Sequence, residues 1–220
     1  MRFCRSVAVV SSVLLGLGCA IAARAQAGVY LGFQATRLSG ITCFDPQGEC
    51  SDPNHDVYPQ GLQVGGYYDF RNIGPIRLGI DVRGGTMHSY KSASSSAGGN
   101  DITVLDNVLA GVRGSFRGPY FWLNPYAQVS VGYARSNATL PFGESPTSIV
   151  PLPRYEDNFV MYEGFIGDSV RLAPWLDLRP IELGIGNMNR FGNSGAPVDG
   201  PSSIGVISIG ASVVLHMPTP

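Results

Sequence analysis

Along most of the chain from residue 27 onward, apolar and polar residues alternate with a period of two, and this pattern most constrains the fold. In the clearest segment, 204–217, Ile207 and Ile209 alternate with Ser208 and Gly210. A period of two is the geometry of a β-strand whose two faces meet different environments. Eight segments carry the pattern and are predicted to be strands. They are residues 27–36, 61–70, 76–90, 102–116, 123–135, 158–171, 176–187 and 204–217.

Helical membrane spans are the alternative for a chain with so few charges. Charged residues make up 14% of the sequence, against about 25% in an average soluble domain. A spanning helix needs about 20 consecutive apolar residues. Beyond the N-terminus, the longest candidate, 204–217, is interrupted by glycine, serine and histidine. Helical spans are therefore excluded, and an all-β chain is predicted.

One expected strand changes phase at a proline. Leu176 and Leu178 precede Pro180, whereas Ile181 and Leu183 follow it, so the apolar positions move from even to odd numbers. A β-bulge inserts one residue and restores the facing of a strand, and bulges also tolerate proline. A β-bulge is therefore expected at this proline.

The connections between the expected strands are alternately short and long. Tight turns are expected at 71–75, 117–122 and 172–175, whereas the long polar connections cover about 38–60, 91–101, 137–155 and 187–203. Turns at one end and long loops at the other are typical of a bacterial transmembrane β-barrel, whose turns face the periplasm.

Aromatic residues gather near both ends of the expected strands. Such residues are typical of the two membrane interfaces of a transmembrane protein, where one end of the ring meets lipid and the other water. The pattern predicts two aromatic girdles. They are Phe70, Phe116, Phe121, Trp122 and Trp175 near the turns, and Tyr58, Tyr90, Tyr133, Tyr155 and Phe159 near the long loops.

The first 25 residues have the pattern of a secretory signal peptide. Two arginines near the start form the positive segment, and an apolar segment, 7–21, follows. Ala23 and Ala25 are the small residues that a signal peptidase reads. Cleavage is expected before Gln26, which leaves 26–220 as the barrel domain.

Removal of the signal peptide changes the charge and the cysteine content. It takes away three arginines and no acid, so 12 basic residues remain against 16 acidic ones. No basic face is left for nucleic acid. Cys4 and Cys19 leave with the signal, unless Cys19 is the lipidated residue of a lipoprotein, an alternative that stays open. Cys43 and Cys50 remain in a loop of an exported chain and are predicted to form a disulfide. Only His55 is close to them, so no metal site is expected.

The charged side chains of the strands are predicted to point into the barrel. Arginine or lysine facing lipid costs about 2–4 kcal/mol at the midplane, so the apolar face must meet the lipid. Both signs together predict paired charges that fill the narrow interior of eight strands. A polar pathway for ions or small solutes is the alternative. The inward charges are Arg77, Asp81, Arg83, Arg113, Glu163, Asp177, Arg179 and Glu182.

Five of these charges lie within a few residues of one level, counted from the short turns. They are Asp81, Arg83, Arg113, Glu163 and Glu182. At least one of the two glutamates is expected to pair with one of the two arginines.

No catalytic set is recognisable in the sequence. His88 and Ser89 are adjacent in an expected strand, so their side chains point to opposite faces and cannot act together. His55 lies in the cysteine-bearing loop, and no nucleophile, base and acid occur with workable spacing. The run 92–99 lacks the lysine and the helix of a phosphate-binding loop. No enzymatic activity, cofactor or metal is expected.

Over nearly all of residues 27–217 the chain resembles the small OmpA/OmpX-type outer-membrane barrels. In the last strand, Ser208, Gly210, Val213 and Leu215 are similar to the C-terminal signal read by the barrel assembly machinery, although the family usually ends on an aromatic residue. The resemblance implies a transmembrane antiparallel up-and-down β-barrel of about eight strands in the bacterial outer membrane. It also implies outer-membrane lipid and the assembly machinery as partners, and a structural or surface-interaction role.

Two other functions stay open at the level of sequence. A narrow channel for small solutes is possible if the inward charges line a pathway. A soluble lipocalin-like binding barrel is also possible, because a period of two does not say which face points outward. The first expected strand has no G-x-W motif and no helix is expected after the last, which disfavours the lipocalin class.

Overall fold

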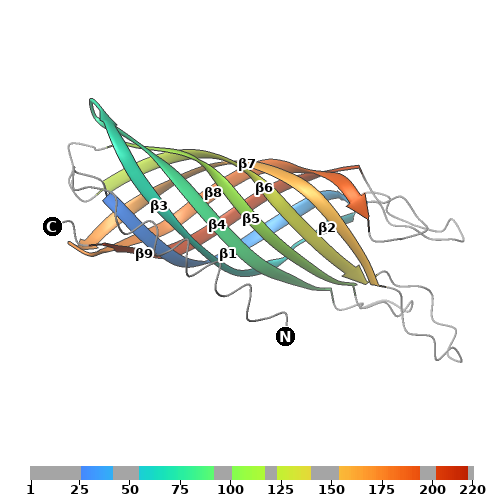
Figure 1. Ribbon diagram of the computed structural model, residues 1–220. Coiled ribbons are helices and arrows are strands. Elements are labelled where there is room, and N and C mark those ends of the chain that lie inside the picture. Colours follow the sequence, from blue (N-terminus) through green and yellow to red (C-terminus); the bar gives the residue numbers. More distant parts are fainter. Residues whose placement is uncertain are drawn as a thin grey trace, which may run out of the picture.

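The computed structural model describes residues 26–41, 55–91, 101–116, 123–139, 154–193 and 202–217, and these form one closed antiparallel β-barrel (Figure 1). Each long strand pairs with the next, and the first also pairs with the last, which closes the sheet. Within the described residues, no helix is long and apolar enough to cross a membrane. The strands are β1 Gln26–Ile41, β2 His55–Val57, β3 Gln60–Ile73, β4 Ile76–Lys91, β5 Asp101–Phe116, β6 Leu123–Thr139, β7 Arg154–Ala173, β8 Leu176–Asn193 and β9 Ser203–His216.

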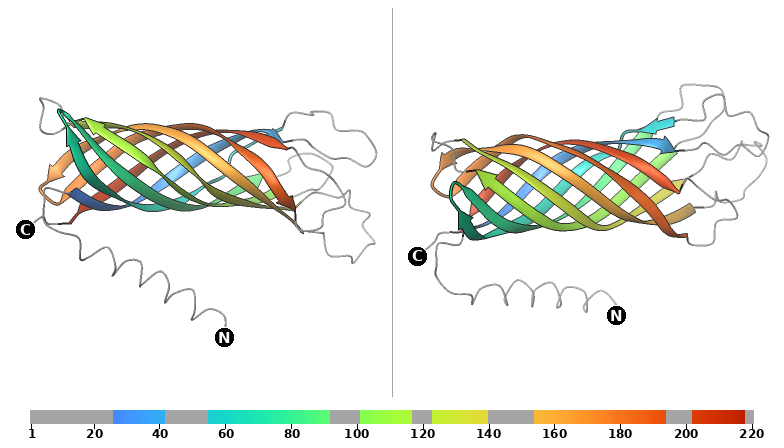
Figure 2. Two further views of the ribbon diagram at one scale, coloured as in Figure 1. Left: turned by 45° about the horizontal axis from the view of Figure 1, so that its top comes forward. Right: turned by 90° about the horizontal axis from the view of Figure 1, so that it is seen from above.

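Eight long strands form the barrel, as the alternation predicted, and they cross it with a strong tilt (Figure 2). Tilt is a geometric requirement of closing a sheet on itself. Two of the short turns contain two residues each, Gly74–Pro75 and Pro174–Trp175. Gly74 has φ of 60°, the left-handed region that favours glycine. We call the end of the barrel that carries these turns the turn end, and the opposite end the loop end.

Both ends of the described chain lie at the turn end. The backbone N–H of His216 donates to the carbonyl of Trp175 at 2.9 Å, and that of Met217 donates to the carbonyl of Ala27 at 3.0 Å. The first bond continues the β8–β9 pair, and the second extends the closing β1–β9 pair beyond the end of β9. The seam of the barrel is thus paired as far as the chain is described.

The short strand β2 lies where the sequence predicted only a loop, and that prediction was wrong. β2 pairs with the end of β1, with Val57 opposite Leu38, and β3 then continues along the same strand. Pro59, between them, has no N–H to donate, but its carbonyl accepts from Thr36 at 2.8 Å. β2 is therefore the continuation of β3 beyond a proline.

Several other strands also run past their predicted ends. Residues 187–193 belong to β8, and β6 and β7 reach Thr139 and Arg154, all inside predicted loops. Strand pairing depends on the backbone, and a polar side chain is compatible with a strand whose outer face meets water. The sequence signal for a strand ended where the apolar outer face ended, which is earlier than the strand itself.

The facing of the side chains agrees with the predicted alternation. Val129 on β6 is 71% exposed, whereas its neighbour Gln128 is 3% exposed. The outer face is apolar on all eight long strands, which is the arrangement of a transmembrane barrel. The soluble lipocalin-like alternative is excluded, because a soluble barrel presents a polar outer face to water.

The β-bulge predicted at Pro180 is present. The register between β8 and β9 shifts between Arg179 and Glu182. Both of these side chains are buried, whereas Pro180 and Ile181 between them are exposed. The extra residue thus returns the strand to its alternation and keeps both charges inside.

The aromatic girdles are only partly as predicted. Phe70, Phe116, Trp175, Tyr58 and Tyr133 are exposed on the outer face. Phe159 is 2% exposed and points into the barrel, so its assignment to the girdle was wrong. Its neighbour Val160 faces outward, and alternation therefore turns Phe159 inward.

Some predictions concern parts of the chain that the structure does not describe. They are the signal peptide 1–25, the Cys43–Cys50 disulfide, the turn 117–122 with Phe121 and Trp122, and the side chains of Tyr90 and Tyr155.

The lipid-facing role of the outer surface can be tested with an arginine scan. Val129→Arg places a charge at the middle of the outer face of β6 and should destabilise the barrel in lipid vesicles by about 2–4 kcal/mol. Ile73→Arg, at the turn end, is the matched control and should cost about 0–1 kcal/mol. The measurement is equilibrium unfolding by denaturant. Equal losses for the two variants would contradict a membrane-spanning outer face.

Candidate functional site in the barrel interior

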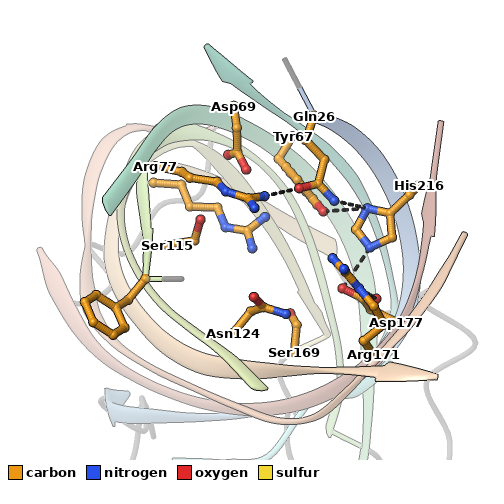
Figure 3. Close-up of a pocket in the computed structure, with 12 residues that line it drawn as sticks. Gln26, Tyr67, Asp69, Arg77, Ser115, Asn124, Ser169, Arg171, Asp177 and His216 are labelled. Atoms are coloured by element: carbon orange, nitrogen blue, oxygen red, sulfur yellow. Dashed lines mark hydrogen bonds and ion pairs between the residues drawn. The ribbon is translucent and has the colours of Figure 1, made fainter. Parts of the chain in front are cut away.

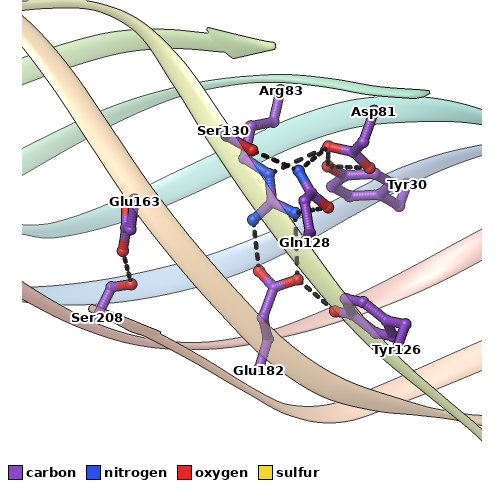
Figure 4. A network of polar contacts seen from close by, with 9 residues as sticks. All are labelled: Tyr30, Asp81, Arg83, Tyr126, Gln128, Ser130, Glu163, Glu182 and Ser208. Carbon is purple, nitrogen blue, oxygen red and sulfur yellow. Dashed lines mark hydrogen bonds and ion pairs between the residues drawn. The ribbon is translucent and has the colours of Figure 1, made fainter. Parts of the chain in front are cut away.

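A network of charged side chains centres on Arg83 of β4 (Figure 4). Its Nη1 donates to Oε1 of Glu182 at 2.7 Å, and its Nη2 reaches Oε2 of the same carboxylate at 3.3 Å. Its Nε donates to Oδ1 of Asp81 at 3.2 Å, and Nη2 also donates to the Gln128 amide oxygen at 2.9 Å. Phe165 lies under the guanidinium, 3.9 Å from Cζ to the ring centroid. Arg83 is thus held on every side.

Neutral groups complete the network around the two acids. The Tyr30 hydroxyl donates to both oxygens of Asp81, at 2.9 and 3.1 Å. The amide of Gln128 donates to Asp81 at 2.9 Å and to the Ser130 hydroxyl oxygen at 2.7 Å. The Tyr126 hydroxyl donates to Glu182. A buried ion pair needs such bonds, because its charges have lost water.

Of the five charges placed at one level by the sequence, the structure brings together Asp81, Arg83 and Glu182. Glu163 stands apart: it accepts a hydrogen bond from the Ser208 hydroxyl, and its Oε2 has no hydrogen-bond partner in the described part of the chain. Arg113 also lies outside the network. It is paired in register with Gly79, four residues nearer the turn end than Arg83. A count of residues from the nearest turn places Arg113 at the level of Arg83. The strands are tilted, however, and Arg113 lies nearer the turn end.

Arg113 and Arg179 form a separate layer, nearer the turn end, with three tyrosines. Arg179 is 1% exposed, and its Cζ lies 4.4 Å from the Tyr30 ring, 4.8 Å from the Tyr126 ring and 5.4 Å from the Tyr67 ring. Arg113 lies 3.9 Å from Tyr67 and 4.5 Å from Tyr126. The ring faces attract both cations.

Each of the three tyrosines lies across a glycine of the neighbouring strand. The register pairs Tyr30 with Gly65, Tyr67 with Gly28, and Tyr126 with Gly167. A Cβ at Gly28 would lie only 2.8 Å from the Tyr67 ring. The glycines therefore make room for rings that lie flat on the inner wall. The sequence contains these tyrosines and glycines, but they can be recognised as facing pairs only when the strand register is known.

Apolar side chains close the interior between the charge network and the loop end. They come from β1, β2 and β4 to β9 and form one buried cluster, which we call the apolar plug. The sequence analysis did not identify it, although inward leucines and methionines interrupt the polar inner face of several strands. The members are Leu38, Val57, Met87, Leu105, Leu109, Ala134, Phe159, Met161, Phe165, Met188, Ile204 and Val206.

A small polar cavity lies at the turn end, with Tyr67 in its wall (Figure 3). Its volume is about 20 Å³, enough for about one water molecule. We call it the turn-end cavity. It is lined by Gln26, Tyr67, Asp69, Arg77, Arg113, Ser115, Phe116, Asn124, Ser169, Arg171, Asp177 and His216.

His216 ties four strands together beside this cavity. Its Nε2 lies 2.8 Å from Oδ2 of Asp177 on β8. With the proton on that nitrogen, Nδ1 accepts from the Gln26 amide of β1 at 2.9 Å and from the Tyr67 hydroxyl of β3 at 3.1 Å. Arg77 of β4 donates in turn to the Gln26 amide oxygen. The last residue of β9 is thus fixed at the seam of the barrel.

The residues of the predicted assembly signal all lie on β9. Ser208 points inward to Glu163, whereas Val213 and Leu215 point outward. Gly210 is paired in register with Gln34 of β1. Among the residues that the structure describes, no group of three or more histidine, cysteine, aspartate or glutamate side chains is placed to hold a metal ion.

Comparison with known proteins supports the fold. No protein-family model and no curated protein matches the sequence. The Neisserial surface protein A aligns with 86% of this chain and 97% of its own, at TM-score 0.51 and 13% identity. The attachment invasion locus protein of Yersinia pestis aligns with 89% of this chain and all of its own, at TM-score 0.46 and 14% identity. The chain therefore has the fold of the small eight-stranded outer-membrane β-barrels.

The coupling between Arg83 and Glu182 can be measured with a double-mutant cycle. Glu182→Ala and Arg83→Ala should each destabilise the barrel by about 3–5 kcal/mol, because each leaves a buried charge without its partner. The double variant should cost clearly less than the two losses combined. Glu163→Ala combined with Arg83→Ala is the control and should show weaker coupling. Additive losses for Arg83 and Glu182 in denaturant titrations would mean that the pair is solvated.

Proposed function

We propose that this chain, with its outer-membrane barrel fold, is a bacterial outer-membrane protein with a structural or surface-interaction role and no catalytic activity. In this proposal the signal peptide at 1–25 directs export. The assembly machinery reads Ser208, Gly210, Val213 and Leu215 on β9 and inserts the barrel into outer-membrane lipid. The observation that carries the proposal is the filled interior.

The filled interior argues against transport. A solute entering from the loop end meets the apolar plug, whose side chains cannot replace its hydration water, and only a few buried polar groups such as Asn107 lie among them. Below the plug it meets Arg83, which is already bound to Glu182, Asp81 and Gln128. The turn-end cavity, of about 20 Å³, does not extend through either layer. A structural closure is therefore favoured over the narrow channel.

The outer face at the loop end favours a role at the cell surface. There the outward side chains change from apolar to polar, at Thr86, Asp106 and Arg135, which lie side by side in register. Pairing of β4 with β5 nevertheless continues to Lys91 and Asp101. Those five further residues extend the paired strands by about 16 Å, at about 3.3 Å per residue. The paired strands thus continue beyond the apolar part of their outer face.

Single-channel recording tests this proposal. The barrel, refolded into detergent and checked by its altered gel migration before and after boiling, is added to a planar lipid bilayer. We expect no steady conductance, because no continuous aqueous path crosses the plug and the network. A porin in the same bilayer is the positive control. A steady, voltage-independent conductance from the folded wild-type barrel would support the narrow channel and contradict the proposed structural role.

A further inference from the structure

The turn-end cavity contains charged side chains that the proposed structural role does not require. Arg77, Arg113 and Arg171 line it together with Asp69 and Asp177. Asp177 is engaged by His216, with 2.8 Å between Oδ2 and Nε2, and its Oδ1 lies 3.7 Å from Nε of Arg171. The basic groups on the wall therefore outnumber the acids available to neutralise them.

Arg113 has donors that point to no acceptor. It is 3% exposed, and its Nε and Nη1 have no hydrogen-bond partner among the described residues. The rings of Tyr67 and Tyr126 lie near its guanidinium at 3.9 and 4.5 Å, but a ring face is a weak substitute for an acceptor in the guanidinium plane. A buried donor without an acceptor costs free energy. An acceptor in the cavity would remove that cost.

The interior charges are also segregated along the barrel axis. In the half near the turn end, four arginines accompany two aspartates: Arg77, Arg113, Arg171 and Arg179, with Asp69 and Asp177. In the network above, one arginine accompanies three acids: Arg83, with Asp81, Glu163 and Glu182. Among these six described side chains the arginines outnumber the aspartates by two, with Arg179 also interacting with Glu182 of the network, and low-dielectric walls strengthen their field.

We propose that the turn-end cavity binds one small inorganic anion of the size of chloride. The anion accepts hydrogen bonds from Nε and Nη1 of Arg113, and the side chains of Ser115, Asn124 and Ser169 on the same wall supply further donors. A volume of about 20 Å³ admits a single atom or water-sized ion. It fits a tetrahedral oxyanion such as phosphate less well, because that ion needs room for four oxygens.

The carboxylate of Asp69 limits the charge of the anion that this site can bind. Asp69 lines the same cavity, its Oδ1 has no hydrogen-bond partner in the described part of the chain, and a second negative charge near its carboxylate is disfavoured. The cavity therefore selects a monovalent anion over a divalent one. Asp69→Asn should raise chloride affinity, which a site dominated by general salt screening would not do.

The test is the thermal unfolding of the folded barrel in a neutral detergent, at constant ionic strength, as chloride replaces gluconate. Gluconate is monovalent but too large for the cavity. In wild type the unfolding temperature should rise with chloride and then saturate. In Arg113→Gln the apparent chloride affinity should fall by about tenfold or more, because a charge-assisted hydrogen bond is lost. Arg71→Gln removes the same charge from the exposed turn end outside the cavity and is the matched control.

Two further readouts keep the proposal decidable if Arg113→Gln does not fold. Ser169→Ala removes only a hydroxyl and should weaken chloride binding while the barrel remains folded. Crystals soaked in bromide should show an anomalous peak beside the Arg113 guanidinium. The proposal is overturned if wild type responds equally to chloride and gluconate, if Arg71→Gln loses the response as fully as the cavity variants, or if bromide is absent from the cavity.

Discussion

Lipid solvates neither a charge nor an unpaired backbone group, and the whole barrel depends on this constraint. The backbone meets it by closing the sheet through the β1–β9 pair, which leaves no open edge among the long strands. The side chains meet it by turning the buried charges inward. Once inside, those charges have lost water and need partners, so Arg83 is bound by Glu182 and Asp81 and held by Gln128. The interior network thus exists because the lipid-facing outer surface cannot hold these charges.

The interior is layered because different strands contribute different side chains at each height. Tyrosines that lie across glycines bring large rings and their hydroxyls into the lumen. Each hydroxyl then reaches a titratable group: Tyr30 reaches Asp81, Tyr126 reaches Glu182, and Tyr67 reaches His216. The same rings cover the guanidinium faces of Arg113 and Arg179. Above these layers the apolar plug completes the closure, and below them a cavity retains a positive excess.

Alternation alone was enough to predict the eight strands, the facing of Val129 and Gln128, and the β-bulge at Pro180, because each is a local property of the chain. The ends of the strands were not predictable, because polar outward residues above the lipid no longer distinguish a strand from a loop. Phe159 was assigned to the outer face because it lies near a loop. Its alternation with the outward Val160 places it inside. The separation of Arg113 from Arg83 depends on strand tilt and register, which no local pattern reports.

The central claim is that the interior arginines are buried, ordered and shielded from water. Solvent exchange of the arginine Nε protons, measured by NMR on the folded barrel in detergent, tests it most directly. The account predicts slow exchange and separate resonances for Arg83, Arg113 and Arg179, against rapid exchange for the exposed Arg71. If the Nε protons of all four arginines exchange equally fast, the interior is an open, hydrated lumen and the account is contradicted.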